Sequence, residues 1–181
     1  MSRVAVRDAR DDDLAAITAI YADGVLTGTG TFELEPPSLA DMAARRASVA
    51  ALGLPWLVAE VDGGVVGYAY AGPFRTRAAY RYTVEDSIYV ASAAQGRGVG
   101  KALLDALLSA CEARGVRQVL AVIGDSANAG SVRLHAGCGF RPMGVIEAVG
   151  WKFDAWRDVV FMQKALGQGG EAKPDTAGLA F

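Results

Sequence analysis

Histidine and cysteine are scarce in this sequence, which has one histidine, His135, and two cysteines, Cys111 and Cys138, in 181 residues. Two cysteines are too few for the disulfide framework of a small secreted domain, and they fit a reducing compartment. The histidine and the cysteines also lack the spacing of metal ligands. We therefore expect no bound metal.

Long apolar runs and an excess of positive charge are missing as well. No apolar run approaches the ~20 residues that cross a bilayer, and residues 1–13 lack the apolar segment of a signal peptide. The formal net charge is −2, which argues against non-specific binding of nucleic acid. We expect a cytoplasmic protein without a nucleic-acid or membrane partner.

The chain is long enough for one domain with a sizeable core. Apolar periodicity and turn residues predict seven strands and four helices in the order β-α-α-β-β-β-α-β-α-β-β. The expected strands cover residues 4–7, 56–61, 65–74, 83–90, 118–123, 142–151 and 158–165, and the expected helices cover residues 11–26, 38–52, 101–115 and 128–139. This order predicts a mixed sheet with helices packed on it. We expect one domain over residues 1–166 and a glycine-rich tail over residues 167–181 that lies outside the core.

Residues that favour helix ends support these boundaries. They are Asp11 or Asp12, the Ser38–Asp41 pair, Gly115 and Asn128.

A glycine-rich turn, QGRGVGKALL, opens the third helix with Gly96, Gly98 and Gly100. Glycine lets the backbone approach a ligand closely, and the free N–H groups of a helix start attract phosphate. Arg97 and Lys101 add positive charge. Because Lys101 is followed by Ala102, the turn is not a Walker A loop, and its glycine spacing does not fit a dinucleotide fingerprint.

The segment IYVASAAQGRGVGKALLDALL resembles the core motif of the GCN5-related N-acetyltransferase (GNAT) superfamily, in which Gln95, Gly98 and Gly100 fill the expected positions. The resemblance extends over about residues 3–166. The segments TGTFELEPPS, YRYTVEDSIYV, VIGDSANAGSVRLHAGCGF and VGWKFDAWRDVVFMQ are similar to the phosphinothricin and methionine sulfone or sulfoximine acetyltransferases. The resemblance implies an α+β fold with a mixed, mostly antiparallel sheet of about seven strands and about four helices.

The resemblance also implies acetyl-CoA as the donor, a small amino-acid amine as the acceptor, and a homodimer. The implied acetyl-CoA contacts are Ile88, Tyr89, Val90, Gln95, Gly96, Arg97, Gly98, Val99, Gly100, Lys101, Asn128 and Ser131. The implied acceptor contacts are Phe32, Arg75, Thr76, Arg77, Glu85, Asp86 and Ser87.

Acetyl transfer requires a base for the ammonium, a donor to the thioester carbonyl and a proton for the thiolate. We expect Glu85 to act as the base through a water, while Asp86 faces the other side of the strand. The backbone N–H of Val90 is the expected donor to the carbonyl. Arg75 and Arg77 suit an acceptor that carries a carboxylate or phosphinate.

His135 occupies about the position where many members of the superfamily carry a tyrosine that protonates the thiolate. We expect it to act in the site together with Glu85, as acid or as base, with a packing role as the alternative. Cys138 could accept the acetyl group with His135 as its base, but the superfamily that the chain resembles transfers the group directly. The following Gly139 and Phe140 indicate a helix end, so we expect Cys138 and Cys111 in the core.

Two other interpretations stay open, and so does the role of one aromatic cluster. The chain could acetylate protein N-termini or ribosomal proteins, or it could bind CoA as a regulatory module without catalysis. The aromatic residues Trp151, Phe153 and Trp156 could pack in the core or form a subunit interface that borders the acceptor pocket.

Overall fold

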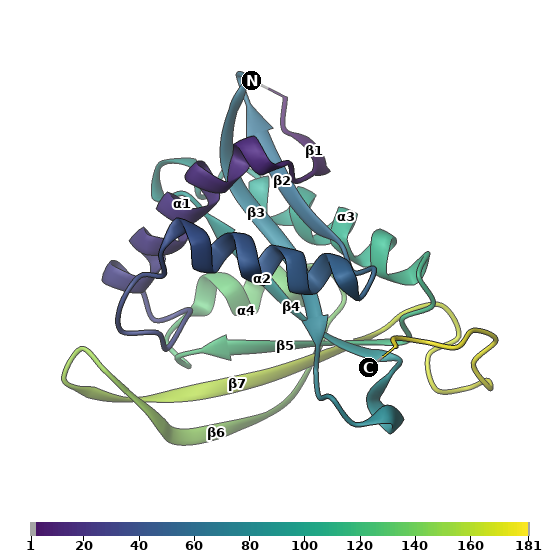
Figure 1. Ribbon diagram of the computed structural model, residues 1–181. Coiled ribbons are helices and arrows are strands. Elements are labelled where there is room, and N and C mark those ends of the chain that lie inside the picture. Colours follow the sequence, from purple (N-terminus) through teal and green to yellow (C-terminus); the bar gives the residue numbers. More distant parts are fainter. Residues whose placement is uncertain (1–2, 181) are drawn as a thin grey trace.

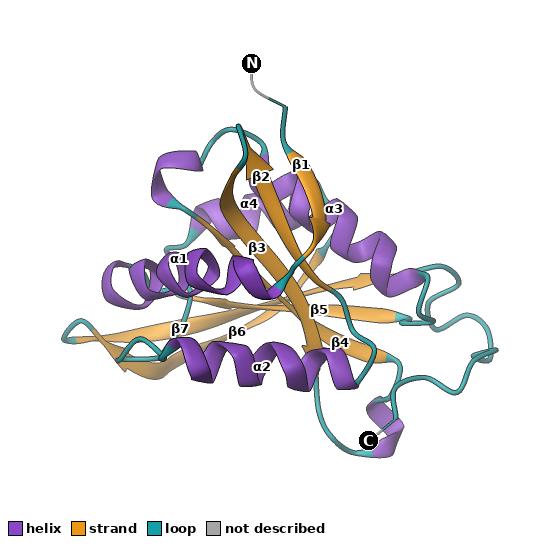
Figure 2. Ribbon diagram, turned by 45° about the horizontal axis from the view of Figure 1, so that its top comes forward, coloured by secondary structure: helices purple, strands orange, loops and turns teal. Residues whose placement is uncertain are grey.

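The computed structural model describes residues 3–180, which form one seven-stranded sheet in the order β1-β2-β3-β4-β5-β7-β6. The strands are β1 (Ala5–Asp8), β2 (Trp56–Val61), β3 (Gly64–Pro73), β4 (Thr83–Val90), β5 (Gln118–Gly124), β6 (Arg141–Lys152) and β7 (Ala155–Ala165). The α-helices are α1 (Leu14–Thr27), α2 (Leu39–Ala51), α3 (Val99–Glu112) and α4 (Ala129–Gly137). Helices α1 and α2 cover one face of the sheet, and α3 and α4 cover the other (Figures 1 and 2). The expected fold class and element order are confirmed.

Most helix ends follow from local chemistry. The Ser38 side chain accepts a hydrogen bond from the Asp41 backbone, and the Asp41 carboxylate accepts one from the Ser38 backbone, which forms the expected capping box. Gly115 has a φ of 79°, and two backbone bonds around it close α3 as the sequence indicates. The expected cap at Asp11 or Asp12 is wrong: these residues lie in a short 3-10 turn, and α1 starts after Asp13.

The feature that positions the site is the separation of β4 from β5, the only parallel pair among the described strands. The two strands pair only from Thr83–Gln118 to Asp86–Ala121. Beyond that point β4 continues along β3 to Val90, whereas β5 continues along β7 to Gly124. The sheet therefore opens into a fork whose two prongs each have one unpaired backbone edge.

The C-terminal segment differs from the expectation that it lies outside the core. Leu179 is buried and belongs to the main hydrophobic cluster. The Tyr82 hydroxyl donates to the Thr176 carbonyl at 2.7 Å, and the Leu179 N–H donates to the Arg81 carbonyl at 2.8 Å. One apolar residue with satisfied backbone groups is enough to fix this segment against the start of β4.

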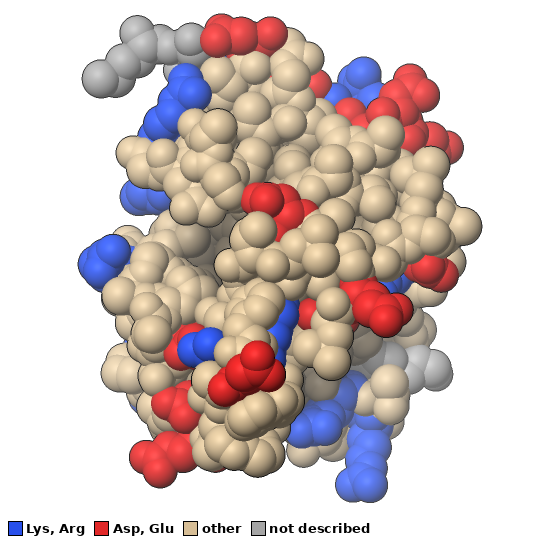
Figure 3. Space-filling model, turned by 90° about the vertical axis from the view of Figure 1, so that its left-hand side faces the viewer, with Lys and Arg blue, Asp and Glu red and all other residues tan. Residues whose placement is uncertain are grey.

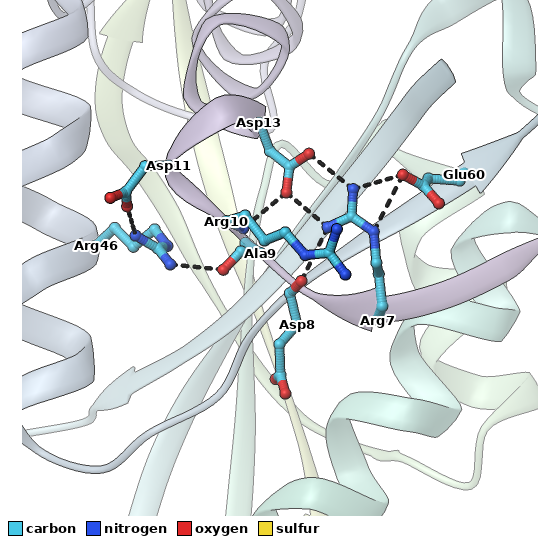
Figure 4. Close-up of polar contacts among 8 residues, drawn as sticks. All are labelled: Arg7, Asp8, Ala9, Arg10, Asp11, Asp13, Arg46 and Glu60. Atoms are coloured by element: carbon cyan, nitrogen blue, oxygen red, sulfur yellow. Dashed lines mark hydrogen bonds and ion pairs between the residues drawn. The ribbon is translucent and has the colours of Figure 1, made fainter. Parts of the chain in front are cut away.

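An ion-pair network ties β1 to β2 and to the start of α1 (Figure 4). The guanidinium of Arg7 donates to both carboxylate oxygens of Asp13, at 2.7 and 2.8 Å, and also pairs with Glu60. Asp13 accepts a further bond from the Arg10 backbone and is almost fully buried. The hydrogen bond from Arg7 lowers the pKa of Asp13 against the opposing effect of burial.

We predict that Asp13→Asn lowers the free energy of unfolding by about 1–3 kcal/mol at neutral pH, because a charge-assisted bidentate contact is lost. The depressed pKa means that the stabilising effect is present above the ordinary pKa, 3.8, and is lost as the pH falls through the folded-state pKa. The difference between wild type and variant in denaturant unfolding should therefore shrink only in acid. Asp12→Asn, an exposed change one residue away, is the control. A pH-independent difference would contradict the assignment.

Candidate functional site

The fork between β4 and β5 opens into a cavity of about 1100 Å³. Figure 3 shows the face of the molecule that is on the left in Figure 1; the surface is hollowed there, and mostly uncharged residues surround the hollow. The cavity passes from the start of α3 to the loop after α1. Its lining includes the fork residues Ser87–Val90 and Ala121–Gly124, the turn residues Gln95, Gly96, Gly98, Gly100 and Lys101, the α4 residues Asn128, Ser131 and His135, and Gly28–Phe32 from the loop after α1.

The free edge of β4 offers backbone groups to this cavity. The Ala91 N–H donates to the Val66 carbonyl of β3. At the other end of the strand, the Tyr82 carbonyl accepts the N–H of Gln118, the first residue of β5. Since alternate residues of a strand direct their backbone groups to opposite sides, Tyr89 faces β3, and Ile88 and Val90 face the fork. The N–H of Val90 thus faces the open side of the strand, where it could donate to a thioester carbonyl as expected from the sequence.

The glycine turn forms an open cradle at the start of α3. Gly96 and Gly98 have φ values of 72° and 81°, and no atom lies within 4 Å of a Cβ placed on either residue. This conformation and this space favour glycine and allow a phosphate to approach the N–H groups of the helix. The Val99 side chain is instead buried in the core, so only its backbone faces the turn. Arg97 is exposed and does not line the cavity, although it belongs to the same turn.

Helix α4 runs along the cavity, with Leu134 next to Gly100 of the glycine turn and Asn128 next to Gly30 of the loop after α1. The Asn128 side chain accepts the Ser131 N–H at 3.2 Å and caps the helix, as expected. Arg133 also lines the cavity and was missed in the sequence, where a single arginine on a short helix gives no signal. It adds a positive charge to the lining of the cavity.

At the other end, Phe32, Glu85 and Ser87 line the cavity together with Tyr70, which was also missed. Arg75, Thr76 and Arg77 are exposed in the loop before β4 and do not line it. The Arg75 guanidinium lies over the Phe74 ring, 5.1 Å from its centre. The predicted acceptor contacts therefore divide into a group inside the cavity and a group outside it.

Glu85 has the environment of a proton acceptor. Burial raises the pKa of its carboxyl group, the Asp86 charge raises it further, and Arg75 opposes both. A raised pKa moves a carboxylate towards the working pH of a general base. Glu85 and Asp86 are consecutive, so they point to opposite faces of the strand, as predicted.

Asp86 and His135 form a buried pair at the base of the fork. His135 Nε2 lies 3.0 Å from Asp86 Oδ2, and Nδ1 lies 2.8 Å from the Ser131 carbonyl. Both ring nitrogens face acceptors, so the geometry favours the protonated imidazolium. Burial lowers the pKa of His135, but the hydrogen bond and the charge of Asp86 outweigh it, and the net shift is upward. Neither nitrogen is free to donate to or accept from a substrate, which argues against a direct role in proton transfer.

We predict that His135→Gln costs about 3–5 kcal/mol of unfolding free energy in mildly acidic buffer, because the buried Asp86 carboxylate loses its charged partner. A raised histidine pKa contributes stability that is complete below the ordinary value, 6.5, and is lost as the pH rises through the folded-state pKa. The gap between wild type and variant should therefore narrow at alkaline pH, as measured by urea unfolding. Arg133→Gln, an exposed change on the same helix, should show no such trend, and parallel curves for wild type and His135→Gln would refute the ion pair.

The cysteines are placed as core residues. Cys111 and Cys138 are both buried and free, and neither lines the cavity. Burial raises the pKa of both thiols, that of Cys111 to about 12. Such thiols are poor nucleophiles at neutral pH, which disfavours an acetyl-cysteine intermediate.

No helix within residues 3–180 combines the length and the apolar character that crossing a bilayer requires. Within the same residues, no three His, Cys, Asp or Glu side chains are grouped so that they could hold a metal ion.

Comparisons with known proteins agree with this geometry. Residues 31–140 match the model of the acetyltransferase (GNAT) family. The chain is 53% identical over 170 residues to a phosphinothricin N-acetyltransferase of Alcaligenes faecalis, covering 94% of this chain and 86% of the relative. It is 41% identical over 162 residues to an L-methionine sulfoximine/L-methionine sulfone acetyltransferase of Pseudomonas aeruginosa, covering 89% of this chain and 94% of the relative.

A solved structure has a similar fold over almost the whole chain. The crystal structure of a phosphinothricin acetyltransferase from Sinorhizobium meliloti in complex with AcCoA superposes with a TM-score of 0.94 at 46% identity, covering 98% of this chain and 96% of that one.

Proposed function

Because the chain belongs to the acetyltransferase (GNAT) family, we propose that it transfers the acetyl group of acetyl-CoA to the α-amino group of a small amino acid or analogue, such as phosphinothricin or methionine sulfoximine. The observation that carries the proposal is the single cavity that joins a phosphate cradle to a carboxylate with a raised pKa. The names of the relatives supply the acceptor class, and the complex with AcCoA supplies the donor.

The donor fits the features of the fork. The N–H groups from Gly96 to Lys101 would hold the pyrophosphate, with Gln95 and Arg97 at the rim of the cradle. The backbone groups of Ile88 and Val90 would hold the pantetheine arm and the thioester, because they face the open side of β4. Tyr89 contributes packing from the opposite face, where its ring meets Tyr21.

Contacts from α4 complete the donor site. Asn128 and Ser131 line the same cavity and would meet the donor near the thioester.

Catalysis then requires two groups of this chain. Glu85 accepts the proton of the acceptor ammonium through a water, and the Val90 N–H donates to the thioester oxygen as the amine attacks and negative charge develops there. When the C–S bond breaks, the CoA thiolate takes the proton that the attacking nitrogen releases. Phe32 and Ser87 border the acceptor amine. Arg75 and Arg77, outside the cavity, can attract an acidic acceptor towards its mouth. His135 acts indirectly in this scheme, by holding α4 against Asp86.

A thiol-release assay with phosphinothricin, methionine sulfoximine, free amino acids and short peptides tests the proposal. We predict that Glu85→Gln lowers kcat/KM by about 10²–10⁴-fold and shifts its pH dependence upward, because only acceptor that is already neutral can then react. In the pH profile of the wild-type enzyme, the loss of kcat/KM on the acid side should occur at a pH above the ordinary pKa of a carboxyl group, since the pKa of Glu85 is raised.

Three results would count against the account. An unchanged pH profile in Glu85→Gln would exclude Glu85 as the base. Turnover of peptides but not of free amino acids would favour an N-terminal or ribosomal-protein acetyltransferase. Binding of acetyl-CoA without turnover of any amine would favour a regulatory module. Glu60→Gln, a carboxylate change on β2 beside Arg7, controls for loss of charge.

We also propose that two copies of the chain associate through β6. This strand is at the edge of the sheet, and its residues from Arg141 to Val149 are all exposed. The exposed apolar side chains on and beside it are Met143, Val145, Ile146, Val149, Trp151, Phe153 and Trp156. An unpaired edge with such a surface is unusual in a monomer, and a second copy offers the complementary edge and face.

Val145→Glu is predicted to shift the protein from dimer to monomer in size-exclusion chromatography with light scattering, because it places a charge in an apolar interface. Leu26→Glu changes an equally accessible leucine on α1 and serves as the control. A wild-type protein that is monomeric at micromolar concentration would overturn the proposed dimer.

The cytoplasm is the proposed place of action, since both cysteines are free thiols and acetyl-CoA is a cytoplasmic metabolite. Acetylation of a toxic amino-acid analogue would remove its amine, so the proposed activity also supports a role in resistance. The role in resistance depends on the acceptor that the assay identifies.

A further inference from the structure

The loop between α1 and α2 is fixed by a buried lysine from the far edge of the sheet. Lys152, the last residue of β6, is only 3% exposed, and its Nζ donates to the Thr31 carbonyl at 2.8 Å. The Thr31 hydroxyl lies 2.9 Å from the Tyr21 hydroxyl, and Glu33 pairs with Arg45 of α2. Three elements thus fix the two neighbours of Phe32.

The ring of Phe32 lies against two glycines, one on β6 and one on β5. A Cβ added to Gly150 of β6 would lie 2.3 Å from the ring, and one added to Gly124 of β5 would lie 3.1 Å from it. Neither glycine has a positive φ, so close approach rather than backbone conformation explains their presence. Phe32 lines the cavity but Gly150 does not, so a side chain at Gly150 would push the ring towards the cavity.

We propose that Lys152 and Gly150 are positioning residues that set the place of the Phe32 ring and thereby the space for the acceptor. The inference rests on the proposed function, in which Phe32 borders the acceptor. Neither residue lines the cavity, and each acts through Phe32 or its neighbour Thr31, so we expect them to affect the acceptor and not acetyl-CoA. Burial lowers the pKa of Lys152, and the charge of Glu33 opposes this shift. The amine also lies over the Phe153 ring, 5.0 Å from its centre.

The first test separates the two substrates. Gly150→Ala should raise the KM for the amino-acid acceptor roughly tenfold, the effect of about one methyl group in a tight pocket, and leave the KM for acetyl-CoA unchanged. Gly64→Ala, at a β3 position where a Cβ meets nothing closer than 3.8 Å, should change neither constant. An unchanged acceptor KM in Gly150→Ala would overturn the proposal.

The second test concerns the lysine. Lys152→Met keeps the length of the side chain and removes the donor, so the acceptor KM should rise, and Lys152→Gln should restore part of the loss through its amide N–H. Lys164→Met is a matched control, because Lys164, on the neighbouring strand β7, also donates to a backbone carbonyl, that of Cys138, at 2.6 Å. It should lose stability without a change in acceptor KM, and the same acceptor effect in this control would contradict a specific role for Lys152.

A third readout does not depend on activity. In protein labelled with fluorophenylalanine, the ¹⁹F resonance of Phe32 should move in Gly150→Ala and Lys152→Met and stay in place in the two controls. If wild type acetylates no amino acid but the resonance moves, the proposed function fails and the positioning of Phe32 stands. If wild type is active and neither the resonance nor the acceptor KM changes, the positioning fails alone.

Discussion

The limited pairing of β4 with β5 is the constraint on which the rest of the site depends. Four residue pairs join the strands, and then each strand follows its other neighbour. The unpaired backbone groups beyond Asp86 would be costly if they were buried without partners. A cofactor arm that offers amides and a carbonyl can satisfy them, which explains why a sheet with this gap suits acetyl-CoA.

The fork also separates the two substrates. Glu85 and Asp86 are consecutive residues at its base and point to opposite faces. The Glu85 face carries Tyr70 and, further along the cavity, Phe32, where we place the acceptor. The Asp86 face meets His135 of α4, and this ion pair joins the helix that follows β5 back to β4. The pair therefore links β4 to the helix that follows β5, at the point where backbone pairing between the two strands ends.

Features set by neighbouring residues could be predicted from the sequence. The caps at Ser38 and Asn128, the glycine end of α3 and the order of the elements all depend on local patterns. The Asp86–His135 bond could not be predicted, because its partners are 49 residues apart and nothing near either one indicates the other.

Other parts of the site have the same long-range origin. Gly150 appears in the sequence as a glycine in a strand, and only the fold shows that it makes room for Phe32. Arg75, Thr76 and Arg77 were expected beside the acceptor because the family resemblance implied it, but the path of their loop leaves them outside the cavity. The tail was expected outside the core because of its composition, but Leu179 packs into it.

Residue-resolved amide hydrogen exchange with and without acetyl-CoA reports which backbone groups of the fork are free to bind the cofactor. Acetyl-CoA should slow exchange at Ile88, at Val90 and in the glycine turn, while Tyr89, whose backbone faces β3, should be unchanged. Uniform slowing along β4, or slowing confined to β6 and β7, would contradict this assignment.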